Sequence, residues 1–545
     1  MAEALRHALM GQCRQCLPGA LAIAGMAVVF LPVLPGLLPL AQGLELAVWR
    51  GLLADAQTLV ALRVTVISSV VSTLLALLLA LLLTMALYPG PRWPALQRRL
   101  PALLAMPHAA FAIGAFFLLA PSGWLARWLA PLAGWDVPPD WQTVRDPYGL
   151  SLGLLLAVKE AIFLLWMLAA VLQEGALQRQ MTLARSLGYG RWQVWWLCLL
   201  PQVLPRLGWP LLAVLAYGVS VVDVALILGP GSPPSLAVLA WRWLADPELA
   251  LQARGAAASW LLLLVFLLLC GCGLLLWRLL RAAWRQPHGR RWAGASWQPR
   301  WLAWPLLGFC YLLALALLLW SLAGPWFFPA ALPQSWTLAG WQQLDTAPLF
   351  TSLGLGLASA GIGLALVLLW LECGPPALSR WLYLPLILPA LPLAAGQYHA
   401  LLMAGLAGSG FGVVWSHLLW VVPYMLLTLY KPYLEFDTRM ITLARSLGLS
   451  HWQRCWRIKW PLLLRPILAA LAIGFAVSIA QYLPTLFAGG GRFATVTTEA
   501  VALSSGGNRR VLAVQAMLQL VLPMLMFALA TLLGQWAGRH RQGWR

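Results

Sequence analysis

The sequence predicts an all-α membrane protein with about twelve transmembrane helices in two six-helix halves that share one orientation. Three observations support this prediction: an apolar composition, the placement of basic residues, and an internal repeat. Of the 545 residues, 61% are hydrophobic and only 10% are charged, and the mean hydropathy is +0.80. Soluble domains carry about 25% charged residues, so this composition argues against a large soluble enzyme.

Apolar runs of about 20 residues can cross the hydrocarbon core of a bilayer. About twelve occur, near 17–41, 58–88, 101–120, 148–172, 199–229, 256–280, 302–324, 349–371, 381–407, 412–430, 460–488 and 511–534. The longest runs exceed the thickness of the bilayer, so we expect tilted or kinked helices. The first run is longer than the apolar part of a signal peptide, so we interpret it as a retained span.

The net charge of +20 is explained by where the basic residues lie. If the N-terminus is cytoplasmic and the chain alternates through twelve spans, most Lys and Arg residues fall at the cytoplasmic ends. This positive-inside bias predicts that both termini are cytoplasmic. The lipid bilayer is therefore the expected partner of the basic surface, and we expect no nucleic-acid partner.

A basic, Trp-rich stretch, Arg285–Arg300, separates the sixth and seventh runs and predicts two domains, 1–290 and 291–545. The segment TLARSLGYGRWQVWW at 182–196 recurs as TLARSLGLSHWQRCW at 442–456, with ten of fifteen residues identical at an offset of 260. Both copies lie between the fourth and fifth runs of their half. The repeat therefore predicts a duplication that preserves orientation, as found in several transporters.

Each copy is expected to form a compact helical knob, near 178–198 and near 438–458. Gly188 and Gly448 end the first short helix of each knob, because glycine adopts the left-handed conformation at little cost. Pro201 and Pro461 begin the next span, where a missing N–H is tolerated. A basic loop that only sets topology is the alternative, but the repeated spacing of Gly, Trp and Pro favours a knob that exposes Arg and Leu to a soluble partner.

The repeated segment resembles the cytoplasmic motif of binding-protein-dependent ABC importer permeases, which reads Glu-Ala-Ala, three residues, Gly, nine residues, Ile, any residue, Leu-Pro. The first copy matches at Ala184, Gly188, Leu200 and Pro201, and the second at Ala444, Gly448, Ile458 and Pro461. Arg-Ser-Leu between Ala and Gly is similar to the branch with thiamine, ferric-iron, polyamine and phosphonate permeases. The departures are Thr182 and Thr442 for Glu, Leu183 and Leu443 for the first Ala, Cys198 for Ile, and Trp460 for Leu.

This resemblance implies a fused permease of the type I importer fold in the bacterial inner membrane. Each knob would be a coupling helix seated in one of two copies of an ATP-binding subunit, and a periplasmic binding protein would deliver the substrate. The implied coupling residues are Thr182, Ala184, Arg185, Gly188, Pro201, Thr442, Ala444, Arg445, Gly448 and Pro461. The chain would contain no ATPase site, because none of its three lysines is followed by the Ser or Thr of a phosphate-binding loop. We expect no cofactor, with ATP bound by the partner subunits.

Polar residues within the apolar runs indicate a pathway or buried pairs, because charges in hydrocarbon are costly. Asp223, Gln481 and Tyr482 lie in the fifth span of each half and are the candidate pathway residues, although Asp223 is also placed to cap a helix. Lys159 and Glu160 point about 100° apart on one helix, so a structural pairing and a substrate role both stay open. Cys13 and Cys16 form a lone C-x-x-C without a second pair, and no other His, Cys or carboxylate cluster shows metal-ligand spacing, so we expect no metal site.

The expected substrate is thiamine or a related organic cation. Ferric iron, a polyamine and an aminophosphonate are the alternatives. A twelve-span secondary transporter shares the composition and the parallel halves. It would not need two knobs, and the loop after the second span lacks the basic motif usual in major-facilitator proteins. A membrane-embedded enzyme would need clustered carboxylates or histidines, whereas the carboxylates here are dispersed. The chain is therefore predicted to be a transport subunit and not an enzyme.

Overall fold

The structure is a computed structural model that describes residues 18–173, 175–284, 301, 303–506 and 508–539. Within these residues the regular structure is helical, apart from one isolated β-bridge between Ala323 and Trp336. The predicted linker Arg285–Arg300 lies outside the described residues.

The helices of the N-terminal half follow a helical segment at 18–30. They are α2 (Val33–Gly36), η1 (Leu38–Leu44), α3 (Leu46–Ala54), α4 (Ala56–Leu87), α5 (Trp93–Ala105), α6 (His108–Leu119), α7 (Trp124–Ala133), α8 (Leu150–Leu172), α9 (Gly175–Ser186), α10 (Arg191–Val194), η2 (Trp195–Leu199), α11 (Leu200–Arg206), α12 (Gly208–Ser220), α13 (Asp223–Leu228), α14 (Leu236–Leu244) and α15 (Leu249–Ala283).

The C-terminal half repeats this order. Its helices are α16 (Ala303–Leu322), α17 (Ala339–Gln342), α18 (Ala347–Cys373), η4 (Pro376–Tyr383), α19 (Leu384–Ile387), α20 (Ala390–Met403), α21 (Gly410–Leu434), α22 (Thr438–Ser446), α23 (His451–Arg454), η5 (Cys455–Lys459), α24 (Trp460–Leu462), α25 (Leu464–Ile479), α26 (Leu483–Gly489), α27 (Val496–Leu503) and α28 (Arg509–Arg539).

Nine described helical segments are long and apolar enough to cross a membrane, and twelve spans result if three bent helix pairs each count as one. The bends measure 57° in the fifth span, 106° in the ninth and 81° in the eleventh. This agrees with the prediction of about twelve spans, kinks included.

The offset of 260 seen in the knob sequence extends through the second part of each half. It relates the first residues of α8 and α21 (150 and 410), of α13 and α26 (223 and 483), and of α15 and α28 (249 and 509). The fold is therefore the predicted all-α membrane fold with two halves related by a duplication that preserves orientation.

Small residues allow the spans to approach closely, which is how helices associate where the hydrophobic effect gives no driving force. A Cβ built on Gly153 of α8 would lie 2.9 Å from the carbonyl oxygen of Ser68 in α4, and one on Gly218 of α12 would lie 3.3 Å from the Cα of Ser69. Three spans of the first half thus meet along a stripe of small side chains.

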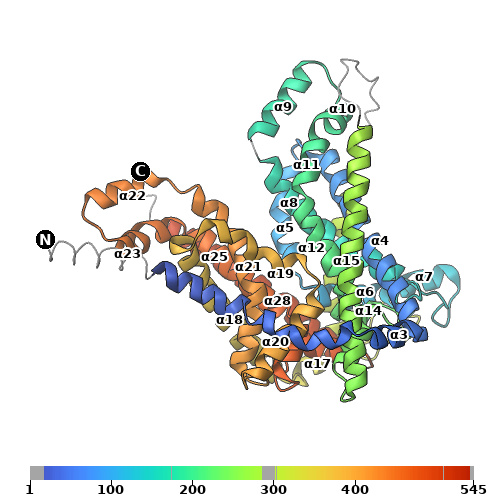
Figure 1. Ribbon diagram of the computed structural model, residues 1–545. Helices are drawn as coiled ribbons and strands as arrows, with labels where there is room; N and C mark the ends of the chain where they lie inside the picture. The colour runs from blue at the N-terminus through green and yellow to red at the C-terminus, as the bar shows by residue number, and fades with distance from the viewer. Residues whose placement is uncertain (1–17, 174, 285–300, 302, 507, 540–545) are drawn as a thin grey trace.

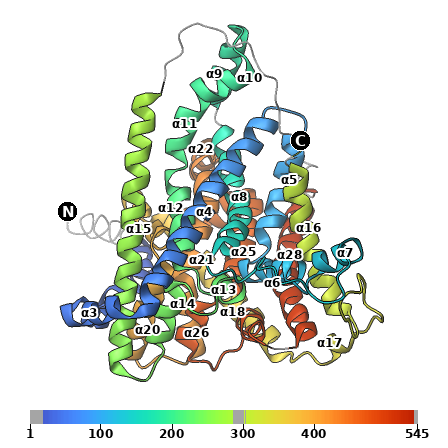
Figure 2. The same ribbon diagram turned by 90° about the vertical axis from the view of Figure 1, so that its right-hand side faces the viewer.

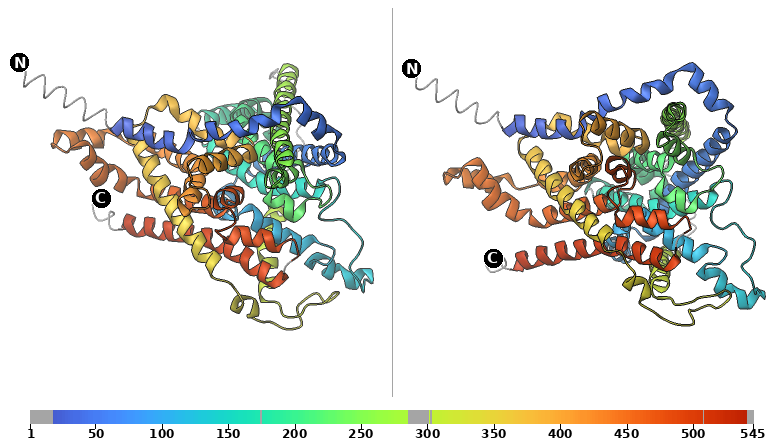
Figure 3. Two further views of the ribbon diagram at one scale, coloured as in Figure 1. Left: turned by 60° about the horizontal axis from the view of Figure 1, so that its bottom comes forward. Right: turned by 90° about the horizontal axis from the view of Figure 1, so that it is seen from below.

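The first span of each half packs on the last span of its own half and also reaches the other half, a crossing that the sequence did not indicate. A Cβ built on Gly36 would lie 1.9 Å from the carbonyl oxygen of Gly396 in α20, and the indole Nε1 of Trp415 in α21 donates to the carbonyl of Val28 at 2.8 Å. In return, Trp320 of α16 stacks on Phe117 of α6, with ring centroids 5.1 Å apart. Figure 3 shows the N-terminal segment (blue) beside helices of the second half (yellow to orange).

The spans form two arms that diverge from a shared base (Figure 1). One arm ends in α9 and α10, at the top of Figure 1, and the other ends in α22 and α23, at the left. The quarter-turn view in Figure 2 again shows α9 and α10 at the far end of their arm. Both repeated segments therefore lie at the extremities of the molecule.

Candidate functional site

The first knob consists of α9, α10 and η2, and its first helix ends as predicted. Gly188 has a left-handed backbone with φ +83°. Its N–H donates to the carbonyl of Arg185 at 2.9 Å, and the N–H of Tyr189 donates to the carbonyl of Ala184 at 3.1 Å. These two bonds define a Schellman end, which satisfies carbonyls that the helix itself leaves unpaired.

The second knob, α22, α23 and η5, repeats this geometry. Gly448 has φ +78°, its N–H donates to Arg445 at 3.0 Å, and the N–H of Leu449 donates to Ala444 at 3.2 Å. Asp437 caps the start of α22 by accepting from the N–H of Arg439 at 2.9 Å. The turn chemistry of both copies is therefore built on the same residues.

Both knobs also share one pattern of exposure. Ala184 and Ala444 face inward and are buried, whereas Arg185 and Arg445 are exposed. Pairs of large apolar side chains remain in the open on each knob: Leu183 and Leu187 on the first, Leu443 and Leu447 on the second. Exposed leucines beside an arginine are typical of a docking surface rather than of a loop that only sets topology.

Thr182 and Thr442, which replace the glutamate of the family motif, use their hydroxyls within their own helices. Thr182 Oγ1 donates to the carbonyl of Gln178 at 3.0 Å, and Thr442 Oγ1 donates to that of Thr438 at 3.1 Å. Both side chains are exposed, and neither provides a carboxylate.

The last segment of each knob, η2 or η5, is a π-helical turn that the sequence analysis did not predict. The N–H of Leu200 donates to the carbonyl of Trp195, five residues back, and that of Trp460 donates to Cys455 in the same way. Pro201 and Pro461 follow immediately, within the first turn of α11 and α24. Because proline cannot donate, the ladder is interrupted here and one wider turn is accommodated.

The candidate pathway residues lie where the fifth span of each half is interrupted. Asp223 is the first residue of α13, after a break at Val221 and Val222 that ends α12. Gln481 and Tyr482 fill the equivalent break between α25 and α26. Interrupted spans of this kind form binding sites in transporters because they free backbone groups and helix ends within the membrane.

Asp223 lies among polar and aromatic side chains from both halves. It is close enough to interact electrostatically with His108 of α6, Tyr217 of α12 and Tyr482 of the second half. The rings of His108 and Tyr217 are 4.5 Å apart. Its position in the first turn of α13 also fits the capping role considered above, since a helix N-terminus favours a carboxylate.

The structure separates the roles of Lys159 and Glu160. Lys159 Nζ is buried and donates to the carbonyls of Leu103 and Leu104, at the end of α5, at 3.0 and 3.4 Å. Glu160 points elsewhere, with its Oε1 at 2.9 Å from Nε2 of His108. Lys159 thus holds two helices together, whereas Glu160 joins the group around Asp223.

Two histidines that bond to other polar side chains of the spans were not singled out from the sequence, nor was His399 of α20. Besides His108, the buried His417 of α21 bonds to Ser478 Oγ at 2.7 Å and to Thr485 Oγ1 at 2.9 Å, and so bridges the break in the eleventh span. An ionisable side chain within an apolar run is the signal that could have identified both.

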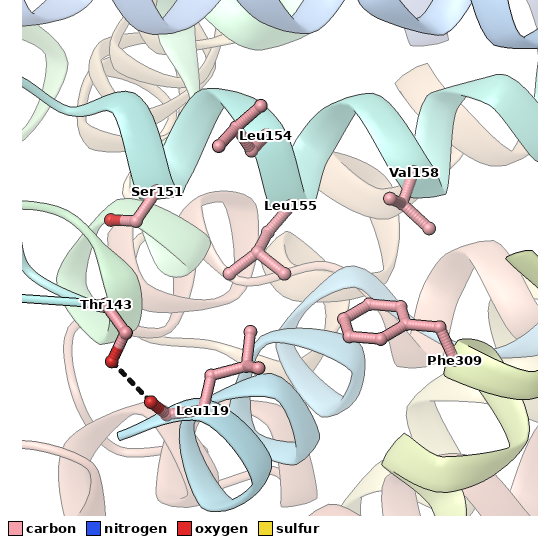
Figure 4. A pocket seen from close by; sticks show the side chains of 7 residues that line it. All are labelled: Leu119, Thr143, Ser151, Leu154, Leu155, Val158 and Phe309. Carbon is pink, nitrogen blue, oxygen red and sulfur yellow. Dashed lines mark hydrogen bonds between the residues drawn. The ribbon is translucent and has the colours of Figure 1, made fainter. Parts of the chain in front are cut away.

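A cavity of about 250 Å³ lies beside α8 and is drawn in Figure 4. It is lined by Leu119, Thr143, Ser151, Leu154, Leu155, Val158 and Phe309. Its walls are mainly apolar, and Thr143 uses its hydroxyl on the carbonyl of Leu119. None of the candidate pathway residues lines it, so we assign it no part in the pathway.

The chain is similar in sequence to several known permease proteins. No family model matches the chain. The inner membrane ABC transporter permease protein YnjC of Escherichia coli strain K12 is 44% identical over 549 residues, covering 100% of both chains.

Two further relatives match over part of their length. The spermidine/putrescine transport system permease protein PotC of the same strain is 22% identical over 162 residues, which are 30% of this chain and 61% of PotC. The thiamine transport system permease protein ThiP of Salmonella typhimurium is 31% identical over 157 residues, which are 28% of this chain and 29% of ThiP. The full-length relationship to YnjC, together with nine to twelve apolar spans in the described residues, shows that the chain belongs to the inner-membrane permeases of ABC transporters.

Proposed function

We propose that the chain forms the complete membrane-spanning part of an importer, driven by two copies of a separate ATP-binding subunit that dock on α9 and α22. A periplasmic binding protein delivers the substrate, and ATP is bound by the partner subunits alone. The proposal places both knobs and both chain termini in the cytoplasm, in agreement with the positive-inside pattern.

The observation that supports this proposal most strongly is the identity of the two knobs in turn geometry and in exposure. The same residues end each helix, the same alanine is buried, and the equivalent arginines Arg185 and Arg445 are exposed together with two equivalent leucines on each knob. A symmetric pair of ATPase subunits requires two equivalent docking surfaces, because each copy presents the same cleft.

Force applied to a knob would be transmitted to the spans through short connections. Arg191, at the start of α10, donates from its Nη2 to the carbonyl of Tyr88, which follows α4, at 2.8 Å. Ala184 packs inward from α9, and η2 leads directly into the fifth span. Movement of the first knob therefore pulls on the second, fourth and fifth spans of its half together.

The substrate that we propose is a small organic cation, with thiamine as the first candidate. Asp223 and Glu160 provide negative charge near the centre of the molecule, and Tyr217, Tyr424 and Tyr482 lie within their electrostatic reach. Aromatic faces and carboxylates together favour a delocalised or quaternary cation. The permease needs no tight site of its own, because the binding protein supplies the affinity.

Transport by the reconstituted complex tests this proposal. Proteoliposomes that contain the chain, its ATPase subunit and its binding protein should take up thiamine only when ATP is supplied on the knob side. Uptake of an anionic or neutral solute, with none of thiamine or another organic cation, would reject the proposed substrate class. ATP-independent uptake would instead reject the importer mechanism.

Subunit stoichiometry gives a second, independent test. Native mass spectrometry of the purified complex should show one copy of this chain with two ATPase subunits, because each chain carries two knobs. Two permease chains for two ATPase subunits would contradict the fused arrangement.

A further inference from the structure

Three metal-ligating side chains meet where the second knob joins the second span of its half. Glu372 lies near the end of α18, His451 begins α23 and Cys455 begins η5. One potential ligand atom from each lies within 4.8 Å of the other two. The sequence spacing did not indicate this cluster, because Glu372 is far from the other two residues in the chain.

His451 lies at or just beyond hydrogen-bond distance from the other two side chains, slightly farther than ligands of one metal ion lie from each other. His451 Nε2 lies 3.7 Å from Glu372 Oε2 and 3.9 Å from Cys455 Sγ. Ligands bound tetrahedrally at about 2.0–2.3 Å from a zinc ion are about 3.3–3.6 Å apart. A small inward shift of the His451 ring would shorten its distances to Glu372 and Cys455 to those between ligands of one ion.

The carboxylate of Glu372 is already oriented for this role. Its Oε1 accepts from Lys459 Nζ at 2.9 Å and from the hydroxyl of Tyr433. That hydroxyl in turn accepts from the indole Nε1 of Trp460 at 2.9 Å. With Oε1 held, Oε2 faces His451. Ligating carboxylates in metal sites are commonly fixed by such outer hydrogen bonds.

Burial and charge also suit a divalent ion. Cys455 is 2% exposed and the Glu372 side chain 6%, whereas the His451 side chain is 48% exposed and lies at the entrance. The carboxylate is already paired with Lys459, so a thiolate formed on binding would supply the additional negative charge, with release of the thiol proton. A water molecule can complete the coordination from the open side.

The first half makes the same junction without these ligands. At the offset of 260, Arg191, Trp195 and Leu199 occupy the positions of His451, Cys455 and Lys459. There Arg191 bonds directly to the backbone after α4. The fold therefore does not require a histidine and a cysteine at this junction, and their presence in the second half needs another explanation.

We propose that Glu372, His451 and Cys455 bind a transition-metal dication of the zinc class, which fixes the second knob to the end of α18. The site is separate from the transport pathway, and its existence does not depend on the substrate. Imidazole and thiolate donors select zinc, cobalt or cadmium over magnesium and calcium.

Cobalt titration of the full chain in lipid nanodiscs tests the site, because a cobalt–thiolate bond gives a charge-transfer absorption band. The parent protein should carry Cys13→Ser and Cys16→Ser, since that pair could itself bind metal. One equivalent of Co²⁺ should produce the band, and Zn²⁺ should displace it. Cys455→Ser should abolish the band, and His451→Gln should weaken binding at least about tenfold.

Matched controls separate binding from misfolding. Cys198→Ser, in the equivalent π-helical turn of the first knob, and Cys373→Ser, next to Glu372, should keep the band. Tyr433→Phe should weaken cobalt binding about 10- to 100-fold, because it frees the carboxylate. Metal-free melting temperatures should match for the parent and His451→Gln, since that side chain is half exposed. No band in the parent, or a band that survives Cys455→Ser, would overturn the proposal.

Discussion

Replacement of Gly448 by alanine tests whether the knobs couple ATP hydrolysis to transport. Gly448 has φ +78°, and a Cβ built there meets no atom within 4 Å. The substitution therefore introduces conformational strain without a steric clash. A non-glycine residue in the left-handed region costs about 1–2 kcal/mol, and a β-branched residue such as valine costs more.

That strain shifts the balance between the ordered Schellman end and a frayed helix end. A cost of about 1–2 kcal/mol corresponds to a factor of about 5–30 in the equilibrium. If the ATPase subunit binds only the ordered end, the dissociation constant rises by up to that factor. Gly448→Val should produce a larger rise, and the same changes at Gly188, with φ +83°, should act on the first knob.

The assay compares ATPase binding, ATP hydrolysis and uptake in the same proteoliposomes. Gly448→Ala should bind the ATPase subunit more weakly and take up less substrate per ATP hydrolysed. The matched control is Gly190→Ala: Gly190 has φ −64°, has no atom within 4 Å of a built Cβ, and corresponds to Ser450 in the second knob. Equal behaviour of Gly448→Ala and Gly190→Ala would refute the reasoning.

Three further predictions concern the pathway, the fold and pH. Asp223→Asn should lower the uptake rate about tenfold, equivalent to about 1.4 kcal/mol in the transport barrier, with an unchanged melting temperature. Normal uptake with a large loss of stability would show that Asp223 only caps a helix. Gly36→Ala should destabilise the chain by about 1–3 kcal/mol in chemical denaturation, because its Cβ would overlap the Gly396 carbonyl, whereas Gly354→Ala, which meets nothing, should not; equal losses would contradict the close packing of the first span. Burial alone would raise the pKa of Asp146, but hydrogen bonds from the side chain and backbone of Ser151 and from the N–H groups of Leu150 and Tyr148 outweigh it and hold that pKa below its usual range. The contribution of the Asp146 carboxylate to folding stability is therefore complete above its unfolded-state pKa of about 3.9 and is lost as the pH falls through the lower folded-state pKa. Asp146→Asn should accordingly lower the melting temperature at pH 7 but not in strong acid. An equal loss at both pH values would refute this assignment.

The sequence predicted the spans and the knob turns because both depend on local properties. The length of an apolar run decides whether it can cross a bilayer, and a glycine two residues after the last helical residue, as Gly188 and Gly448 are, decides how that helix ends. The repeat strengthened these predictions, because the same residues recur at equivalent positions of both halves.

The crossing of the first spans to the other half and the Glu372 cluster depend on contacts between distant segments, which no local pattern indicates. An apolar first span is equally compatible with lipid, with its own half and with the other half. The π-helical turns were also missed, although Pro201 and Pro461 were noted, because proline shows where the ladder is interrupted but not how the backbone compensates. The roles of Lys159 and Glu160 were left open because they too depend on contacts with distant segments. The positions of two adjacent residues on a helix do not indicate which neighbouring helices their side chains contact.

The crossing of the first span to the other half has a consequence for how the protein is made. Gly36 leaves the ribosome about 360 residues before Gly396, the residue on which it packs. At about 5–20 residues per second, the first span waits about 20–70 s in the bilayer before the second-half part of its packing surface exists.

During that interval the surface around Gly36 is available to unrelated helices. Because both halves belong to one chain, the late-arriving surface reaches the waiting helix at a high effective concentration. Fusion of the halves thus shortens the time for which the inserted first span lacks its second-half partner. If the halves were separate chains, this contact would require a bimolecular encounter in the membrane.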